Sequence, residues 1–286
     1  MADVLHAHAT SPSPADVPQV DDGPVDVAVQ AHGPSVFSLP LATLSATDPL
    51  RWLQRGWQDF RACPRIGLFY GLCFFLMGHA LLAVFQNAPA YVLALSAGFL
   101  LMGPFLCLGL YDASKALEVH DHRPSLRASL QAWRPTQSTM AIFAGVLLIL
   151  EMLWGRASLV VFAVSFNTLP EKASLLAMLI DPENLGFLIT YTVVGAVFAS
   201  LIFTTSVISI PMIMDRQVDA ISAGLTSIRA CLQNPGVMLL WGALITGIVL
   251  LSMLPLFLGL FIAGPVIGHA TWHAYRQLVP SVPPAP

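Results

Sequence analysis

A short residue pattern occurs three times in this sequence, and each copy precedes two long apolar stretches. Each copy has apolar residues at positions i, i+4 and i+7, a small residue at i+3 and an arginine at i+8. The copies are Leu53, Gly56, Trp57, Phe60 and Arg61; Leu126, Ser129, Leu130, Trp133 and Arg134; and Ile221, Gly224, Leu225, Ile228 and Arg229. A proline follows each copy, at Pro64, Pro135 and Pro235. Because a repeated unit of secondary structure constrains the architecture of the whole chain, the sequence predicts three copies of one helical unit.

The composition places this unit in a membrane. Charged residues make up 10% of the 286 residues and hydrophobic residues 56%, and the mean hydropathy is +0.73. A soluble chain of this length needs more charge to cover its surface. Several stretches of about 20 residues have almost no ionisable group, and a helix of that length crosses the ~30 Å hydrocarbon core of a bilayer. The sequence therefore predicts an all-α polytopic membrane protein, and the absence of a basic stripe predicts no nucleic-acid partner.

The first 45 residues differ in composition from the rest of the chain. They are rich in Pro, Ala, Asp and Val and contain no Lys or Arg. Such a segment buries too little apolar surface to offset its ordering entropy, so we expect 1–45 to be a disordered cytoplasmic tail. Residues 46–279 form the predicted membrane domain, and residues 280–286 form a proline-rich C-terminal tail.

The membrane domain divides into three repeats, at about 48–118, 121–214 and 217–278. Each repeat is expected to begin with an amphipathic helix in the membrane interface, at 49–63, 123–134 and 217–232. The expected interfacial anchors on these helices are Trp57, Arg61, Trp133, Arg134 and Arg229. Each interfacial helix leads into two antiparallel spans, and the six spans are predicted at 66–85, 91–111, 139–154, 187–212, 237–253 and 257–275. The apolar run 157–166 is too short to cross alone, so it either extends the third span or lies in the interface.

The positions of the basic residues predict the orientation of these spans. Of the 13 Lys and Arg residues, all except Arg156 and Lys172 lie before the first span, between the second and third, between the fourth and fifth, or after the sixth. Basic residues are enriched on the cytoplasmic side of membrane proteins. We therefore expect both termini and all three amphipathic helices in the cytoplasm, with the three repeats parallel to one another.

Several strings of residues carry a resemblance to a known family. They are GWQDFR at 56–61, DRQVDA at 215–220, NPGVMLLWG at 234–242 and GHATWHAYR at 268–276. With these strings, the region from about 45 to 279 resembles a bacterial family of predicted integral membrane proteins of unknown function. Some members of that family are labelled cytochrome c oxidase subunit I. The resemblance implies a six-span fold and a location in the bacterial inner membrane, and it implies no catalytic residues.

The oxidase label can be compared with the histidines of the chain. A haem-copper oxidase subunit holds its haems and its copper through several histidines inside the membrane. Here the histidines within or near the expected spans are His79, His269 and His273. We therefore expect no oxidase chemistry, and an association with respiratory complexes remains open.

The first candidate site lies at the end of the sixth expected span. His269 and His273 are four residues apart, so their rings project from one face of a helix. That spacing suits two ligands of one zinc or copper ion. Asp112 and Asp215 are expected at a similar depth and would supply the further ligands. The alternative is an interfacial polar cluster without a metal.

The second candidate site pairs His79 with Glu151. Both are expected roughly 20 Å from the cytoplasmic boundary, at 1.5 Å per helical residue. An ionisable residue at that depth normally has a partner, so the two would share a proton or form an ion pair. The alternative is that Glu151 lies near the outer interface and extends to water.

No nucleotide-binding, serine-hydrolase or zinc-protease motif occurs in the sequence, and we do not expect an enzyme. The first interpretation is a non-catalytic inner-membrane scaffold or accessory factor, without a cofactor, that associates with respiratory-chain complexes. The second is a small transporter or channel with His79 and Glu151 in its path. The third is a haem- or copper-binding membrane protein that uses His269 and His273. The expected partners are the lipid bilayer and either a membrane-protein complex or a second copy of the chain.

Overall fold

The computed structural model describes residues 40–87, 92–119, 124–165 and 181–280. All of these residues fall in one compact unit, Val36–Pro286. Most of the expected disordered tail, the outer segment around Lys172 and the last six residues lie outside the described residues. Within the described ranges every regular element is a helix, which confirms the all-α class.

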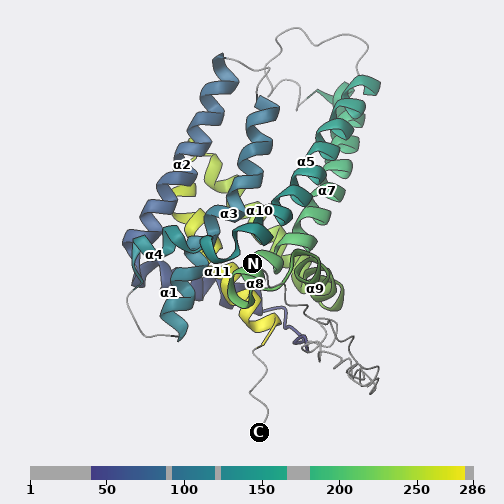
Figure 1. Ribbon diagram of the computed structural model, residues 1–286. Coiled ribbons are helices and arrows are strands. Elements are labelled where there is room, and N and C mark those ends of the chain that lie inside the picture. Colours follow the sequence, from purple (N-terminus) through teal and green to yellow (C-terminus); the bar gives the residue numbers. More distant parts are fainter. Residues whose placement is uncertain (1–39, 88–91, 120–123, 166–180, 281–286) are drawn as a thin grey trace, which may run out of the picture. The chain divides into compact units, whose positions relative to one another are not determined.

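Figure 1 shows the helices in their order along the chain. They are α1 (Asp48–Ala62), α2 (Pro64–Asn87), α3 (Val92–Val119), α4 (Leu126–Gln131), α5 (Gln137–Ser165), α7 (Leu185–Ser206), α8 (Ser209–Arg216), α9 (Ala220–Gln233), α10 (Pro235–Met253) and α11 (Leu260–Leu278). Two short 3₁₀ helices, η3 (Arg134–Thr136) and η4 (Pro182–Asn184), precede α5 and α7.

Four helical segments of the described chain are long and apolar enough to cross a membrane. They are Pro64–Val84, Leu126–Ser165, Pro182–Arg216 and Pro235–Met253. The remaining two predicted spans correspond to α3 and α11, which are helical but are not among these four segments. Helix α11 differs from the four in its second half, where polar residues replace the apolar run. The structure thus supports several membrane helices and leaves the number six as a prediction.

The third and fourth expected spans differ in detail from the structure. Helix α5 continues without a break to Ser165, so the apolar run after residue 156 extends the third span. The fourth span ends at Ser206, and a separate helix, α8, begins at Ser209. Pro211 explains this break, because its ring has no N–H for the carbonyl of Val207 and collides with that carbonyl in a continuous helix.

Helix α11 lies at the centre of the helix packing. It packs against α1, α2, α3, α8 and α10. The crossing with α1 is close because Gly56 faces the backbone of Val266 and Ala270. Next to this crossing, Trp52 and Trp241 are fully buried and pack edge to face, with ring centroids 5.5 Å apart. The largest side chains of the core therefore surround the second half of α11.

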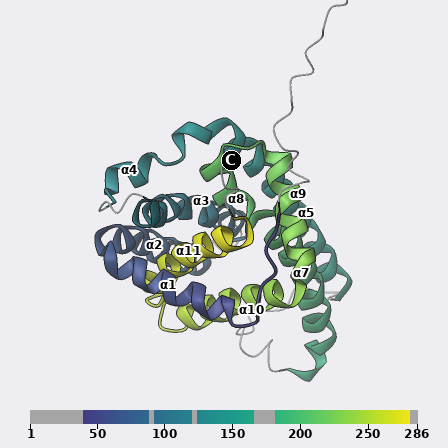
Figure 2. The same cartoon turned by 90° about the horizontal axis from the view of Figure 1, so that it is seen from below.

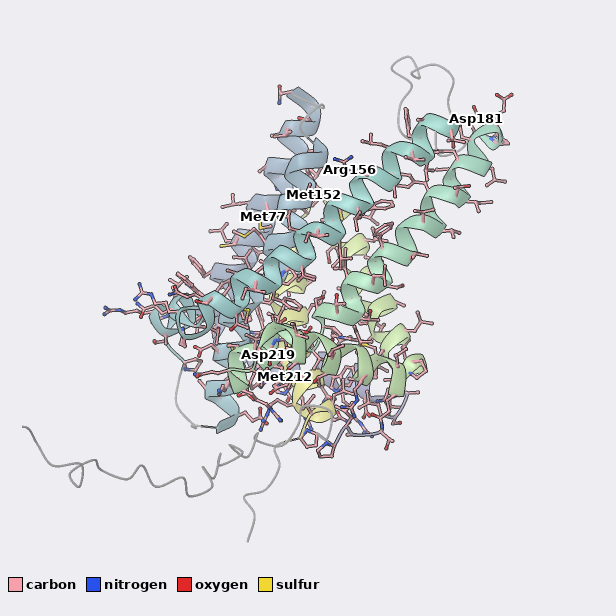
Figure 3. All side chains as sticks on the ribbon, turned by 45° about the vertical axis from the view of Figure 1, so that its right-hand side comes forward. Met77, Met152, Arg156, Asp181, Met212 and Asp219 are labelled. Carbon is pink, nitrogen blue, oxygen red and sulfur yellow. The ribbon has the colours of Figure 1, made fainter. Side chains whose placement is uncertain are left out.

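The outward faces of the long helices are apolar. Along α5 and α7, exposed large side chains include Ile142, Ile149, Val160, Ile189 and Val197. Figure 3 shows these two helices with their side chains projecting outward between Asp181 at one end and Asp219 at the other. An exposed apolar surface of this extent marks contact with lipid or another protein. It supports the membrane class independently of the hydropathy of the sequence.

The short helices α1, α4 and α9 lie at one end of the bundle. Figures 1 and 2 show them around the ends of α3, α8 and α11, at the lower end of Figure 1. Each precedes a pair of longer helices in the chain: α1 precedes α2 and α3, α4 precedes α5 and α7, and α9 precedes α10 and α11. Helix α4 is shorter than expected, because the chain turns into η3 at Arg134 next to Pro135.

The ordered chain begins earlier than the composition suggests. Residues 42–44, expected in the tail, bind the junction of α9 and α10 and the end of α11. The amide of Ala42 donates to the Leu278 carbonyl at 3.0 Å. The side chain of Asn234 accepts from the Leu44 amide at 2.9 Å and donates to the Ala42 carbonyl at 3.1 Å. These backbone bonds order a segment whose composition alone predicts disorder.

Candidate functional site around helix α11

Polar side chains from four helices meet around the second half of α11. One part of this group joins α1, α3 and α11 through hydrogen bonds. The Ser114 hydroxyl lies 2.6 Å from Asp59 Oδ2 and 2.7 Å from His269 Nδ1. The same Asp59 oxygen lies 2.8 Å from His273 Nε2. Ser114 and His269 are fully buried, whereas Asp59 and His273 keep a small contact with the surface.

A second part of the group joins α3, α8 and α11 through Asp215. Its carboxylate lies 2.7 Å from Lys115 Nζ and accepts a hydrogen bond from the Tyr275 hydroxyl, also at 2.7 Å. The neighbouring Arg216 donates to the Tyr275 oxygen at 3.0 Å and to the Val279 carbonyl at 2.6 Å. The end of α8 is thereby fastened to the end of α11.

A third part joins α3 and α11 through Glu118. The indole N–H of Trp272 donates to this carboxylate at 2.9 Å, and Arg276 Nε lies 3.3 Å from it. The Arg276 guanidinium also lies over the Trp272 ring, 5.9 Å from its centroid. Together these groups form what we call the α11 cluster. Its members are Asp59, Ser114, Lys115, Glu118, Asp215, Arg216, His269, Trp272, His273, Tyr275 and Arg276.

The structure brings together only part of the metal site considered from the sequence. His269 contacts Ser114, and His273 contacts Asp59; the sequence singled out neither of these partners. Asp215 instead pairs with Lys115. Asp112 lines a cavity of about 370 Å³ that Lys115 and Gln217 also line. Among the described residues, no group of at least three His, Cys, Asp or Glu side chains could hold a metal ion.

His79 and Glu151 occupy separate places in the structure. The His79 ring lies 4.1 Å from the Phe75 ring, and its Nδ1 lies 3.2 Å from the Phe75 carbonyl. Glu151 is buried on α5, which packs against α7 and α3. No hydrogen bond or ion pair between His79 and Glu151 occurs in the part of the chain that the structure describes. The expected proton-sharing pair is therefore not formed in this conformation.

The expected interfacial anchors lie mainly on the outside of the short helices. Trp57 is 43% exposed and stacks on Phe60, and Trp133 is 47% exposed. Arg61 and Arg134 are exposed, whereas Arg229 on α9 is half-buried. An exposed indole beside an exposed arginine suits the boundary between hydrocarbon and lipid headgroups.

Two cysteines outside the spans are buried and unreactive. Burial, with the nearby Asp59 carboxylate adding to it, raises the pKa of the Cys63 thiol to about 12. Burial alone raises the pKa of Cys231 on α9 to about 12. A thiol reacts as its thiolate, so both groups are inert near neutral pH. They fill space in the core rather than serving as nucleophiles.

Comparison with known proteins gives one family. Residues 92–215 match the family described as "Predicted integral membrane protein (DUF2189)". The match begins with α3 and ends one residue before the end of α8, a shorter region than the resemblance seen in the sequence. No curated protein and no solved structure matches the chain. The match confirms the resemblance: residues 92–215 are similar to a family of predicted integral membrane proteins of unknown function.

Proposed function

We propose that the protein is a non-catalytic membrane scaffold or accessory factor, built from three parallel repeats with six spans. The observation that carries this proposal is the pairing inside the α11 cluster. Each carboxylate of the cluster contacts a basic side chain on another helix: Asp59 contacts His273, Glu118 contacts Arg276, and Asp215 contacts Lys115. Contacts of this kind hold helices together, and all three carboxylates of the cluster take part in them.

The helix lengths support six spans. Helix α11 has 19 residues, which at 1.5 Å per residue gives about 28 Å, close to the thickness of the hydrocarbon core. Helix α3, with 28 residues, is longer than the bilayer core requires. The position of α1, α4 and α9 at one end of the bundle agrees with three repeats of the same orientation. The basic residues on these helices favour the cytoplasmic side of a bacterial inner membrane.

The outward faces of α1 and α4 supply the surface for a partner in this proposal. They present Trp57 with Arg61 on α1 and Trp133 with Arg134 after α4. A respiratory-chain complex, another membrane protein or a second copy of the chain would meet this surface at the lipid boundary. The function then depends on these exposed side chains and tolerates changes at His79 and Glu151.

The test is affinity purification of the full chain from its native membranes in mild detergent. The combined variant Arg61→Gln and Arg134→Gln removes charge from the proposed partner surface. The combined variant His79→Ala and Glu151→Gln serves as the matched intramembrane control. We expect the co-purifying protein bands to be lost only in the arginine variant. Loss of the co-purifying protein bands in the intramembrane variant alone would overturn the proposal.

The second candidate is a small transporter or channel, and one observation favours it. A cavity of about 520 Å³ lies between α2, α3, α7, α10 and α11, and its walls include Ser206 and Thr271. Neither His79 nor Glu151 lines this cavity. For the third candidate, a haem or copper protein, the visible spectrum and metal content of the same preparation provide the test. A Soret band that disappears in His269→Ala would support it.

A further inference from the structure

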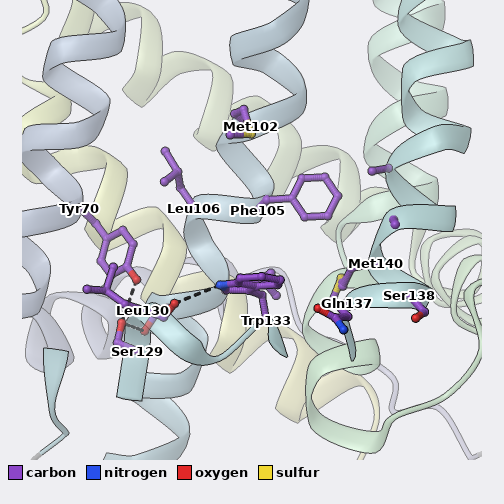
Figure 4. Close-up of a pocket in the computed structure, with 14 residues that line it drawn as sticks. Tyr70, Met102, Phe105, Leu106, Ser129, Leu130, Trp133, Gln137, Ser138 and Met140 are labelled. Atoms are coloured by element: carbon purple, nitrogen blue, oxygen red, sulfur yellow. Dashed lines mark hydrogen bonds between the residues drawn. The ribbon is translucent and has the colours of Figure 1, made fainter. Parts of the chain in front are cut away.

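We propose that a cavity beside α4 binds one anionic phospholipid at a site that shares Trp133 and the neighbouring Arg134 with the partner surface of the scaffold proposal. The cavity has a volume of about 780 Å³, within the range of roughly 300–1,000 Å³ that is common for small-molecule sites. It lies between α2, α3, α4 and α5 (Figure 4). We call it the α4 cavity and define it by Tyr70, Phe105, Leu106, Ser129, Trp133 and Met140.

One part of the α4 cavity is apolar. Met102, Phe105 and Leu106 of α3 face it from one side, and Met140, Ala141 and Ala144 of α5 line the other. Both sets of residues lie in long helices with apolar outward faces, and α5 belongs to one of the segments able to cross a membrane. The cavity therefore opens at the depth of lipid chains, and an acyl chain suits its walls.

The other part of the α4 cavity is polar and firmly built. The Ser129 hydroxyl lies 3.0 Å from the Tyr70 hydroxyl and donates to the Gly109 carbonyl at 2.8 Å. These bonds tie α4 to α2 and α3, and any side chain at position 109 would collide with Tyr70. Gln137 and Ser138 also line the cavity and are exposed. Their amide and hydroxyl groups can hydrogen-bond the ester or phosphate oxygens of a lipid.

The charge around the α4 cavity is positive. Arg134 lies in the chain between the lining residues Trp133 and Gln137, and Arg127 precedes the lining residue Leu130 by three positions on α4. Both arginines are exposed, and residues 124–150 contain no Asp or Glu. Asp112 is the nearby acidic group: it interacts electrostatically with the lining residue Tyr70, and it lines a neighbouring cavity together with the cationic Lys115. Basic pockets between membrane helices bind anionic headgroups, so the occupant is a phospholipid with net negative charge.

The exposed Trp133 completes the site. Its indole N–H donates to the Leu130 carbonyl at 3.1 Å, which fixes the ring at the edge of the cavity. Tryptophan is favoured at the level of the lipid headgroups. The ring therefore lies where the headgroup of a bound lipid meets its acyl chains.

The first experiment is native mass spectrometry of the purified full chain with added phosphatidylglycerol or phosphatidylcholine. We expect one phosphatidylglycerol to bind more tightly than phosphatidylcholine. The combined variant Arg127→Gln and Arg134→Gln is expected to weaken this binding about fivefold for each arginine removed. The matched control, Arg55→Gln with Arg65→Gln, changes exposed arginines on α1 and α2 and is expected to bind as the wild type. Equal binding of the two lipids by the wild type would overturn the proposal.

A second pair of variants tests the cavity itself. Ala144→Phe places a ring inside the α4 cavity and is expected to abolish the tight lipid adduct. Ile142→Phe changes a residue of the same helix that is 63% exposed, and it is expected to keep the adduct. Equal adducts in the two variants would refute binding in the cavity.

A measurement that does not use Ala144→Phe covers the case in which that variant does not fold. Brominated phosphatidylglycerol quenches the fluorescence of nearby tryptophans. The fluorescence of Trp133 is obtained as the difference between the emission of the wild type and that of Trp133→Phe. We expect this contribution to be quenched more strongly by the brominated anionic lipid than by brominated phosphatidylcholine. Trp57, which is similarly exposed on α1, provides the control through Trp57→Phe. Equal quenching of Trp57 and Trp133 by the anionic lipid contradicts a specific site.

Discussion

The close crossing of α1 and α11 makes a strong prediction about Gly56. A Cβ atom at this position would lie 2.5 Å from the Val266 carbonyl oxygen and 2.7 Å from the Ala270 amide nitrogen. Both neighbours are backbone atoms, so a change of rotamer cannot relieve the contact. The substitution Gly56→Ala must therefore move one helix away from the other by roughly 1 Å, the distance that restores ordinary contact.

The change in the free energy of unfolding caused by Gly56→Ala follows from two opposing effects. Forcing an extra carbon into a packed interface costs about 1–3 kcal/mol, and backbone neighbours favour the upper part of that range. Replacing Gly by Ala inside a helix gains roughly 0.5–1 kcal/mol. We therefore expect Gly56→Ala to lower the free energy of unfolding by about 2 kcal/mol.

Gly224 provides the matched control, because it has the corresponding place in the third copy of the sequence pattern. Among the described residues, nothing outside the backbone of its own helix lies within 4 Å of the position that a Cβ atom would take. The added methyl group meets no obstacle there, and only the gain in helix propensity remains. Gly224→Ala should therefore raise the free energy of unfolding by up to about 1 kcal/mol.

The assay is thermal unfolding of both variants in the same detergent, followed by circular dichroism. At about 2–4 °C per kcal/mol for a chain of this size, the two Tm values should differ by roughly 5–10 °C. Hydrogen exchange of the α1 amides should rise in Gly56→Ala alone, because only that variant loosens α1 from α11. Equal Tm values for the two variants would refute the close docking of α1 on α11.

Three further predictions concern the ends of the helices and the α11 cluster. Asp219 caps α9 by accepting from the Ser222 amide. Hydrogen bonds from the Ser222 side chain and from its amide lower the pKa of Asp219. The cap should stabilise fully above the usual pKa of about 3.8 and fade as the pH falls through the lowered value. Asp219→Ala should therefore lower the free energy of unfolding by about 0.5–2 kcal/mol at pH 7, measured by thermal unfolding, and remove that part of the acid dependence. Cys63 and Cys231 should resist a maleimide at about pH 7.5 in the folded protein and react after denaturation, as read by mass spectrometry; rapid labelling of either in the folded state would contradict its burial. A double-mutant cycle of Lys115→Met and Asp215→Asn should give a coupling of about 1–3 kcal/mol, and additive effects would show that the 2.7 Å contact contributes nothing.

The sequence was most informative about where helices begin and end. The first interfacial helix was expected over 49–63, and α1 spans Asp48–Ala62. The prolines after the repeated pattern lie at or next to the starts of α2, η3 and α10. The break between α7 and α8 was not predicted, because hydropathy stays high through residue 212. Pro211 held the relevant signal, since proline disrupts the turn that precedes it.

The candidate site was only partly predictable. The four-residue spacing of His269 and His273 predicted both rings on one helical face; in the structure His269 contacts Ser114, and His273 contacts Asp59. Asp59 lies 214 positions before His273 in the chain. Helical periodicity predicts which residues share one face of a helix, but it does not predict which other helix packs against that face. The identity of the neighbouring helix depends on how the helices pack, and a single sequence does not encode that contact in any local pattern.

The central position of α11 has a consequence for biogenesis. Helices α1, α2, α3, α8 and α10 are all synthesised before α11, yet each packs against it. Until α11 emerges, Asp59, Glu118 and Asp215 lack their partners His273, Arg276 and Tyr275. The earlier helices must therefore wait in the bilayer as a loose assembly with incompletely paired carboxylates. Arrival of α11 then supplies the missing partners of all three carboxylates in one late step.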